Sequence, residues 1–203
     1  MGQCILIFGA VLITAGPWQQ VSAGDGQFLL DLVMERNQTV EAIVKSPTEG
    51  ETPEERAQIK SIVSELFDFS SFSQTSLGRY WKDRTEAERA EFTDLCKRLI
   101  EKNYADPKLY KKAEKVVYDG GTVDGDMGEV KTIVFYKTEE STIDYQLKKV
   151  GEKWLIYDMV IDDLSVAKNN RSQFRKEIRK TSYEGLVKKL KDKLAKEEEQ
   201  QPK

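Results

Sequence analysis

Four successive stretches of alternating apolar and polar residues constrain this chain more than any other feature of its sequence. They are rich in Val, Ile and Tyr, and they cover residues 115–119, 129–137, 141–150 and 153–161. The segments between them are short and contain turn formers such as Gly120-Gly121 and Gly151-Glu152. Alternation at period two with such breaks predicts a four-stranded antiparallel sheet in which each strand pairs with the next.

The alternation also predicts which side chains share a face of this sheet. The expected inner face consists of Val130, Thr132, Val134 and Tyr136 on the second strand and Ile143, Tyr145 and Leu147 on the third. The last strand is largely apolar on both faces, with Trp154, Ile156, Asp158 and Val160 on one and Leu155, Tyr157, Met159 and Ile161 on the other. This pattern is typical of a central strand that is covered on both sides.

Helical spacing of apolar residues flanks the predicted strands. Helices are expected over residues 25–45, after the capping-box sequences that begin at Thr52 and Thr85, after Asp106-Pro107, and from Leu164 to about Lys196 with a break near Ser182–Gly185. Helices before and after a meander predict an α+β fold, in which N-terminal and C-terminal helices cover a curved antiparallel sheet.

The composition excludes several classes of function. The 203 residues include 32 Lys and Arg, 35 Asp and Glu, two Cys and no His, for a net charge of −3. Without His there is no His general base and no His-ligated metal, and two Cys cannot form a Cys-rich zinc site. We therefore expect no metal and no cofactor. A net charge near zero also gives no electrostatic footprint for nucleic acid.

Residues 1–23 have the features of a signal peptide. They contain no charged side chain, an apolar run from Cys4 to Ala15, and a small-x-small site at Val21-Ser22-Ala23. The run is too short for a full membrane span, which needs about 20 apolar residues. Cleavage predicts an exported protein, whereas a retained anchor is the alternative. Removing the leader leaves one thiol, Cys96, on an apolar helix stripe, where a buried small residue is favoured over a reactive group.

Two features could carry chemistry. Asp158 lies in an apolar strand, where a carboxyl group with a raised pKa is one interpretation and a carboxylate satisfied by a backbone amide or by Arg171 is the other. Asp162-Asp163 precedes Leu164-Ser165 and is interpreted as the turn that begins a helix. The loop at residues 120–125 matches no phosphate-binding or calcium-binding motif.

The C-terminal helices are strongly basic. Residues 164–194 contain ten basic and three acidic side chains. A solvated helix face is the simplest interpretation, and an anionic partner surface or membrane head groups come next. The candidates for docking a partner are Arg171, Arg175, Lys176 and Arg179.

Two groups of motifs resemble the signatures of one protein family. The first comprises Phe67-Asp68-Phe69, Leu77-Gly78-Arg79-Tyr80-Trp81 and the helix with Glu88, Phe92 and Leu99 through Tyr104. The second comprises Ile143-Asp144-Tyr145, Trp154, Tyr157-Asp158-Met159-Val160, Leu164-Ser165 and Asn170-Arg171-Ser172-Gln173-Phe174. These motifs resemble the MlaC family, the periplasmic phospholipid-shuttle component of the Mla lipid-asymmetry ABC transport system, also called the toluene-tolerance auxiliary component family. The family commonly has Glu-Gly where this chain has Asp162-Asp163.

The resemblance implies a soluble, non-enzymatic carrier in the periplasm. Residues 24–196 would form a single lipid-carrier domain with a sheet related to the NTF2-like type, followed by a polar tail at residues 197–203. The carrier would hold phospholipid acyl chains in an apolar cavity. It would exchange lipid with an outer-membrane lipoprotein–porin complex and an inner-membrane ABC complex that contains an MCE-domain ring.

A carrier of this kind needs a dry cavity, because two tails of about 16 carbons represent on the order of 25 kcal/mol of hydrophobic free energy in water. Aromatic residues on the helices and the sheet could line such a cavity or form an ordinary core, and composition does not decide between the two. The predicted lipid-binding residues are Phe69, Leu77, Tyr80, Trp81, Phe92, Leu99, Tyr104, Val134, Tyr136, Tyr145, Leu147, Tyr157, Met159, Val166 and Phe174.

Two alternative functions remain open at this level. An NTF2-like enzyme, such as an isomerase or dehydratase, would need Asp158 beside Tyr145 or Tyr157 in the cavity, since no His is present. A periplasmic interaction or chaperone module would instead use the basic C-terminal helix as its docking face, and this role is compatible with lipid carriage.

Overall fold

The computed structural model describes residues 26–45 and 52–198 and shows an α+β chain, as expected. Before the sheet come α1 (Gln27–Val44), α2 (Pro53–Leu66), α3 (Phe69–Leu77), the 3-10 helix η1 (Gly78–Trp81), α4 (Glu86–Tyr104) and α5 (Pro107–Lys112). After the sheet come α6 (Val166–Lys180) and α7 (Tyr183–Glu198). The predicted signal peptide and residues 199–203 of the predicted tail lie outside the described residues.

One antiparallel sheet follows the helices in strict meander order. Its strands are β1 (Lys115–Asp124), β2 (Met127–Phe135), β3 (Glu140–Val150), β4 (Lys153–Ile161) and β5 (Leu164–Ser165). The prediction of four strands was wrong, since the sheet has five. The fifth strand has only two residues, which is too short to show a period of two.

A tight turn joins β4 to β5. Ile161 pairs with Leu164, and the two residues between them, Asp162 and Asp163, both have positive φ, at 48° and 64°. Two central residues with positive φ are typical of a type I′ hairpin. The interpretation of Asp162-Asp163 as the beginning of a helix was therefore wrong. Ser165 caps α6 instead, because its side chain accepts a hydrogen bond from the Lys168 amide at 3.0 Å.

An irregularity in β4 changes which side chains face the helices. Gln146 pairs with Asp158 and Leu147 pairs with Ile156, so Tyr157 is an extra residue in β4. A bulge of this kind reverses the alternation beyond it. Ile156 and Met159 consequently share a face, whereas unbroken alternation had placed them on opposite faces.

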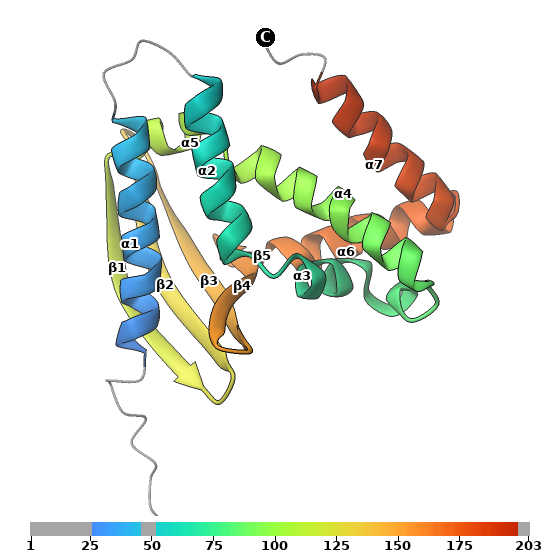
Figure 1. Cartoon of the computed structure of the whole chain (residues 1–203), viewed down its shortest axis with the longest axis horizontal. Coiled ribbons are helices and arrows are strands. Elements are labelled where there is room, and N and C mark those ends of the chain that lie inside the picture. Colours follow the sequence, from blue (N-terminus) through green and yellow to red (C-terminus); the bar gives the residue numbers. More distant parts are fainter. Residues whose placement is uncertain (1–25, 46–51, 199–203) are drawn as a thin grey trace, which may run out of the picture.

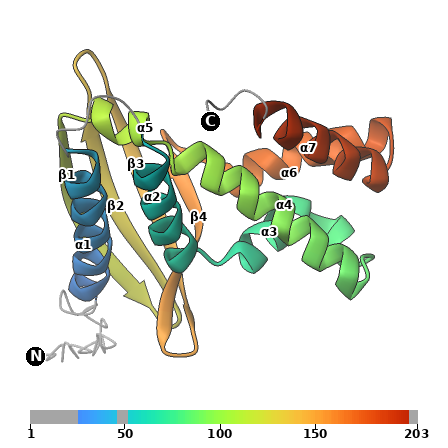
Figure 2. The same cartoon turned by 45° about the horizontal axis from the view of Figure 1, so that its top comes forward.

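Two groups of helices pack against different parts of the sheet. Figures 1 and 2 show α1 and α2 side by side over one face of the sheet, with α5 near one end of it. In both views, α3, α4, α6 and α7 form a second group beside β4. A parallel bridge between Phe67 and Ile156, with the Asp68 amide donating to the Ile156 carbonyl at 2.8 Å, attaches the α2–α3 connection to β4.

The helix boundaries follow the sequence signals. Thr52 and Glu55 form a capping box at the start of α2, and Thr85 and Glu88 form another at the start of α4, as predicted. Gly26 lies so close to the backbone of Gly121 that a Cβ atom on Gly26 would come within 2.0 Å of the Gly121 carbonyl oxygen. A residue without a side chain therefore lets the start of α1 rest directly on β1.

Candidate functional site

A cavity of about 420 Å³ lies between the sheet and the helices α1, α2 and α5. Its sheet wall consists of Val116, Val134, Tyr136, Ser141, Ile143, Tyr145, Ile156, Met159 and Ile161. The register explains this wall, because Val130 pairs with Tyr145 and Tyr145 pairs with Met159. Side chains at alternate positions on neighbouring strands therefore point into the same space.

The helical wall is mainly aliphatic. It is formed by Val40 and Val44 of α1, Ile62, Val63 and Leu66 of α2, and Ile100 and Tyr104 of α4. Only a small cluster of fully packed residues, Val40, Val44, Ile59 and Ala105, joins these helices to one another. The apolar stripes of α1 and α2 thus cover a void as well as a core.

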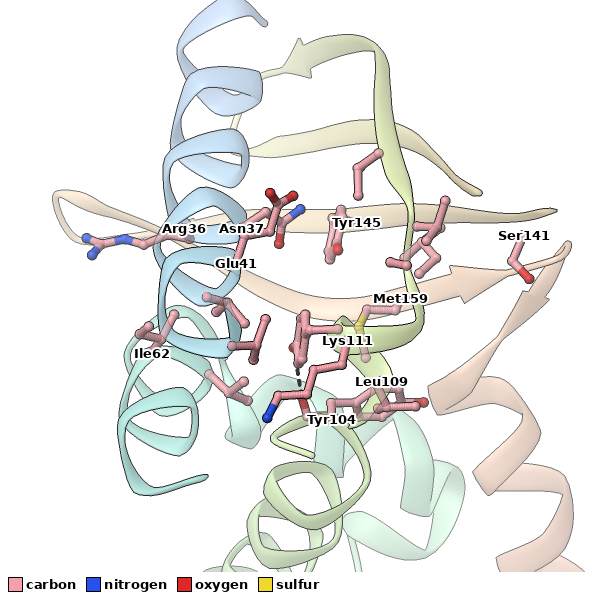
Figure 3. Close-up of a pocket in the computed structure, with 18 of the residues that line it drawn as sticks. Arg36, Asn37, Glu41, Ile62, Tyr104, Leu109, Lys111, Ser141, Tyr145 and Met159 are labelled. Carbon is pink, nitrogen blue, oxygen red and sulfur yellow. Dashed lines mark hydrogen bonds between the residues drawn. The ribbon is translucent and has the colours of Figure 1, made fainter. Parts of the chain in front are cut away.

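The polar groups inside the cavity are mostly tyrosine hydroxyls and one amide. Figure 3 shows Asn37 and Glu41 leaving α1 on the side of Tyr145, whereas Arg36 leaves it on the opposite side. Burial raises the pKa of Tyr145 to about 12, and a hydrogen bond with Asn37 opposes that shift. The Tyr110 hydroxyl donates to the Tyr104 carbonyl at 2.7 Å, and burial raises the pKa of Tyr110 as well. These hydroxyls therefore remain neutral near pH 7 and satisfy their hydrogen-bonding needs within the wall.

Charged side chains lie where the cavity approaches the surface near α5. Lys45, Lys111, Glu114 and Lys115 all line it and are all exposed. Lys45 pairs with Glu41 at 2.9 Å, and Lys111 pairs with the buried Glu55 of α2 at 3.3 Å. The site therefore combines an apolar interior with a charged rim, an arrangement that suits an amphiphilic ligand.

Asp158 serves as a helix cap and does not line the cavity. Its carboxylate accepts hydrogen bonds from the Met159 and Ala167 amides, each at 2.9 Å, and from the Ser165 hydroxyl. These donors hold the first turn of α6 against β4. The interpretation of a carboxylate satisfied by backbone amides is confirmed, and the geometry gives Asp158 no access to a ligand in the cavity.

A second hollow of about 920 Å³, here called the groove, lies between α4, α6 and α7. Its apolar side chains include Leu99, Val166, Phe174 and Leu190, and its polar ones include Asn170 and Gln173. Three residues, Ile100, Tyr104 and Ile161, line both the groove and the cavity. The two spaces are therefore adjacent, and Tyr104, the last residue of α4, lies between them.

The fifteen predicted lipid-binding residues fall into three places. The cavity includes Tyr104, Val134, Tyr136, Tyr145 and Met159. The groove includes Leu99, Val166 and Phe174, together with Tyr104. The remaining seven line neither space: Phe69, Leu77, Tyr80, Trp81, Phe92, Leu147 and Tyr157. Phe92, Leu77 and Leu147 are instead fully buried in the main core.

The prediction did not include the contribution of α1 and α2. Val40, Val44, Ile62, Val63 and Leu66 line the cavity, and each had been recognised only as part of an apolar helix stripe or left unassigned. Helical spacing shows that a face is covered. It does not show whether side chains or empty space cover it.

The predicted docking residues are exposed on α6. Arg171, Arg175, Lys176 and Arg179 all lie in the first four turns of that helix. The stem of Arg171 lies against Gly78, which has a φ of 60°. Arg179 is close enough to Tyr80 to help lower the pKa of that phenol, although the hydrogen bond from Arg79 is the larger cause. Whether these residues bind a partner stays a prediction.

Other kinds of site are not evident in residues 26–45 and 52–198. These ranges contain no cluster of three or more carboxylate or thiol groups able to hold a metal ion. None of the helices described there has the length and apolar character needed to cross a membrane. Burial raises the pKa of the Cys96 thiol to about 12, which agrees with a structural role for that residue.

An open antiparallel sheet whose helical cover encloses an apolar hollow defines a class of α+β proteins with a cavity between sheet and helices. Residues 35–192 match the family described as MlaC protein. The chain belongs to this family, as its motifs indicated.

The solved structures include a related fold. A phospholipid-binding protein from Ralstonia solanacearum, determined in complex with a phospholipid, superposes with a TM-score of 0.68 at 23% sequence identity. The likeness covers 82% of this chain and 97% of that one, and it shows a common fold. No curated protein matches the sequence.

Proposed function

We propose that this chain is a non-enzymatic periplasmic carrier that binds phospholipid acyl chains in the cavity between α1, α2 and the sheet. The observation that carries the proposal is the apolar cavity itself, in a chain of the MlaC family. The phospholipid held by the Ralstonia solanacearum protein, which has the same fold, supports the choice of ligand.

The energetics of the cavity suit this role. If a methylene occupies about 30 Å³, close to the share of a water molecule in the liquid, a volume of 420 Å³ matches about fourteen methylenes. Burying them replaces about 11 kcal/mol of lost contact with the bilayer, at about 0.8 kcal/mol for each methylene. Non-covalent burial of this size is enough to carry a chain through water.

The carrier would exchange lipid at two membranes. Its partners would be the inner-membrane ABC complex with its MCE-domain ring and the outer-membrane lipoprotein–porin complex. The predicted cleavage of residues 1–23 would release it into the periplasm. The exposed basic residues of α6 would contribute to docking.

Mass spectrometry of organic extracts tests ligand binding directly. Protein purified from the periplasm should release phospholipid in near-stoichiometric amount, whereas an unrelated periplasmic protein purified in parallel should release none. Recovery of no phospholipid from well-folded protein would contradict the proposal.

Lipid transfer between reconstituted donor and acceptor complexes tests docking. Reversing the charges of Arg175, Lys176 and Arg179 together should slow transfer while leaving bound lipid unchanged. A matched triple reversal at Lys188, Lys191 and Lys193 on α7 controls for net charge. Unchanged transfer in the α6 variant would remove α6 from the docking surface.

The alternative of an enzyme with a buried Asp is not favoured by the position of Asp158. Its carboxylate is occupied by three donors at the start of α6 and lies outside the cavity lining. A folded Asp158→Asn variant that still carries lipid would remove the reason for that hypothesis. Loss of a defined turnover without loss of lipid would revive it.

A further inference from the structure

The cavity is too small for a whole diacyl phospholipid, and this inference rests on the proposed function. Two chains of about sixteen carbons need on the order of 900 to 1000 Å³, at about 30 Å³ for each methylene. The cavity offers about 420 Å³. It therefore accommodates about one acyl chain, and the second chain must lie elsewhere.

The groove provides the missing volume at the right place. It encloses about 920 Å³ and meets the cavity at Ile100, Tyr104 and Ile161, which line both spaces. No other element separates the two hollows at these residues. Two chains that leave one glycerol backbone could therefore enter one space each.

The groove also has the chemistry of a chain site that ends at a head group. Leu99, Phe174 and Leu190 provide apolar surface inside it, and all three pack in or against the main core. Asn170, Gln173 and Lys193 lie along its polar side. Lys193 and Asn170 belong to different helices, α7 and α6, so polar groups reach the groove from both sides.

Tyr104 is suited to divide the two chains. Its carbonyl group is held by the Tyr110 hydroxyl at 2.7 Å, whereas its own hydroxyl has no hydrogen-bond partner in the part of the chain that the structure describes. The ring is half-buried between the cavity and the groove. Its backbone is therefore fixed while the phenol is free to adjust to a ligand on either side.

We propose that a diacyl phospholipid straddles Tyr104, with one acyl chain in the cavity and the second in the groove between α4, α6 and α7. The groove is then a binding site for a hydrocarbon chain. Its occupation distinguishes diacyl lipids from lipids with one chain.

A bulky side chain in the groove tests the proposal. Gln173→Trp places an indole in the groove, whereas Ser172→Trp places it on an exposed position of the same helix that does not line the groove. Asn170→Trp is a second variant that lines the groove. The probes are dipalmitoyl phosphatidylglycerol and its one-chain lysophosphatidylglycerol counterpart, and the measurement is the dissociation constant of each for delipidated protein.

Each methylene withheld from burial weakens binding about fourfold, so withholding three lowers affinity about sixtyfold. Gln173→Trp and Asn170→Trp should therefore weaken dipalmitoyl binding at least about sixtyfold while changing lysolipid binding less than about threefold. Ser172→Trp should change neither. Equal affinities for the diacyl probe in wild type and both groove variants would overturn the placement of the second chain. Failure of the wild type to bind either probe would instead overturn the proposed function.

Discussion

The half of the molecule formed by α3, α4, α6 and α7 is packed solid, whereas the half formed by α1, α2, α5 and the sheet is partly hollow. In the first half, the Phe92 ring meets Phe174 edge-on at 5.7 Å and Tyr183 at 6.3 Å. In the second, aliphatic side chains such as Val44 and Val134 face one another across about 420 Å³ of space. Protein interiors are normally packed to crystal-like density, so the difference marks the hollow half as the site for a ligand.

The difference shows how residue size and element geometry act together. Large rings from three helices converge on one point and fill it. Valine and isoleucine side chains on a curved sheet and on two helices attached to its edge do not reach one another. A stability cost follows, because the wall of an empty cavity loses contacts that a filled core retains.

The largest expected effect is the loss of Phe92. Phe92→Ala should lower the free energy of unfolding of the delipidated protein by about 3 to 5 kcal/mol, because it empties a fully packed site. Urea denaturation followed by circular dichroism measures the change. Ile62→Ala, on the wall of the cavity, serves as the comparison and should cost clearly less. Equal losses would mean that the two halves are equally packed.

Alkaline titration should weaken the hollow half through Tyr145. Its folded pKa of about 12 lies above the ordinary value of 10.0, so the neutral form is favoured in the folded state. The corresponding stability is present below pH 10 and is lost as the pH rises toward 12. The loss is up to about 2 to 3 kcal/mol, at 1.36 kcal/mol for each pKa unit.

Tyr145→Phe isolates this contribution. Other buried tyrosines titrate in the same range, so the informative quantity is the difference between wild type and variant in urea denaturation at pH 9 and pH 12. The variant should lose less stability over that interval. A difference that does not change with pH would show that Tyr145 ionises as readily in the folded protein as in the unfolded chain.

Two valines on the same strand compare the two kinds of packing most closely. Val130 and Val134 both lie on the inner face of β2, but only Val134 lines the cavity. Val130→Phe should lower the free energy of unfolding by about 1 to 3 kcal/mol through overpacking. Val134→Phe should leave stability near wild type and reduce phospholipid recovery.

Measurements of unfolding by urea and of extracted lipid by mass spectrometry check both valine variants. If Val134→Phe were as destabilising as Val130→Phe, the cavity would be too small for even a phenyl ring. Such a result would remove the contrast between the hollow and packed regions of β2.

The smallest expected effect concerns Asp144 on β3. Burial, followed by the negative charge of Glu129, raises the pKa of this carboxyl group above 3.8. The neutral form is therefore favoured in the folded state, and its stabilising contribution is lost as the pH rises through the raised pKa. Because the group is largely exposed, Asp144→Asn should stabilise the protein at pH 7 by only a few tenths of a kcal/mol. Thermal unfolding at pH 3 and pH 7 measures it, and a larger gain at pH 3 would contradict this sign.

Much of the fold was predictable because its signals are local. The capping boxes at Thr52 and Thr85 and the helix break before Tyr183 are all present as the sequence indicated. The strand alternation correctly placed Val130, Thr132 and Leu147 in the interior. The bulge at Tyr157 and the two-residue strand β5 were missed, because neither leaves a periodic signal.

The site was less predictable than the fold. Aromatic residues such as Phe92 were expected to line a cavity, but they fill the core, and the aliphatic stripes of α1 and α2 line the cavity instead. A stripe of Val and Ile has the same spacing over a void as over a packed neighbour. Only the distance between facing elements distinguishes the two cases.

The amino-acid sequence by itself determined the order of helices and strands, the caps that begin the helices, and the motifs by which the chain is recognised as a member of its family. Each of these depends on residues within a few positions of one another. The tertiary structure decided where the molecule is hollow, which face Met159 presents and how Tyr104 comes to lie between two spaces. A void is a relation between surfaces that are distant in sequence, so it exists only once the sheet and the helices are assembled.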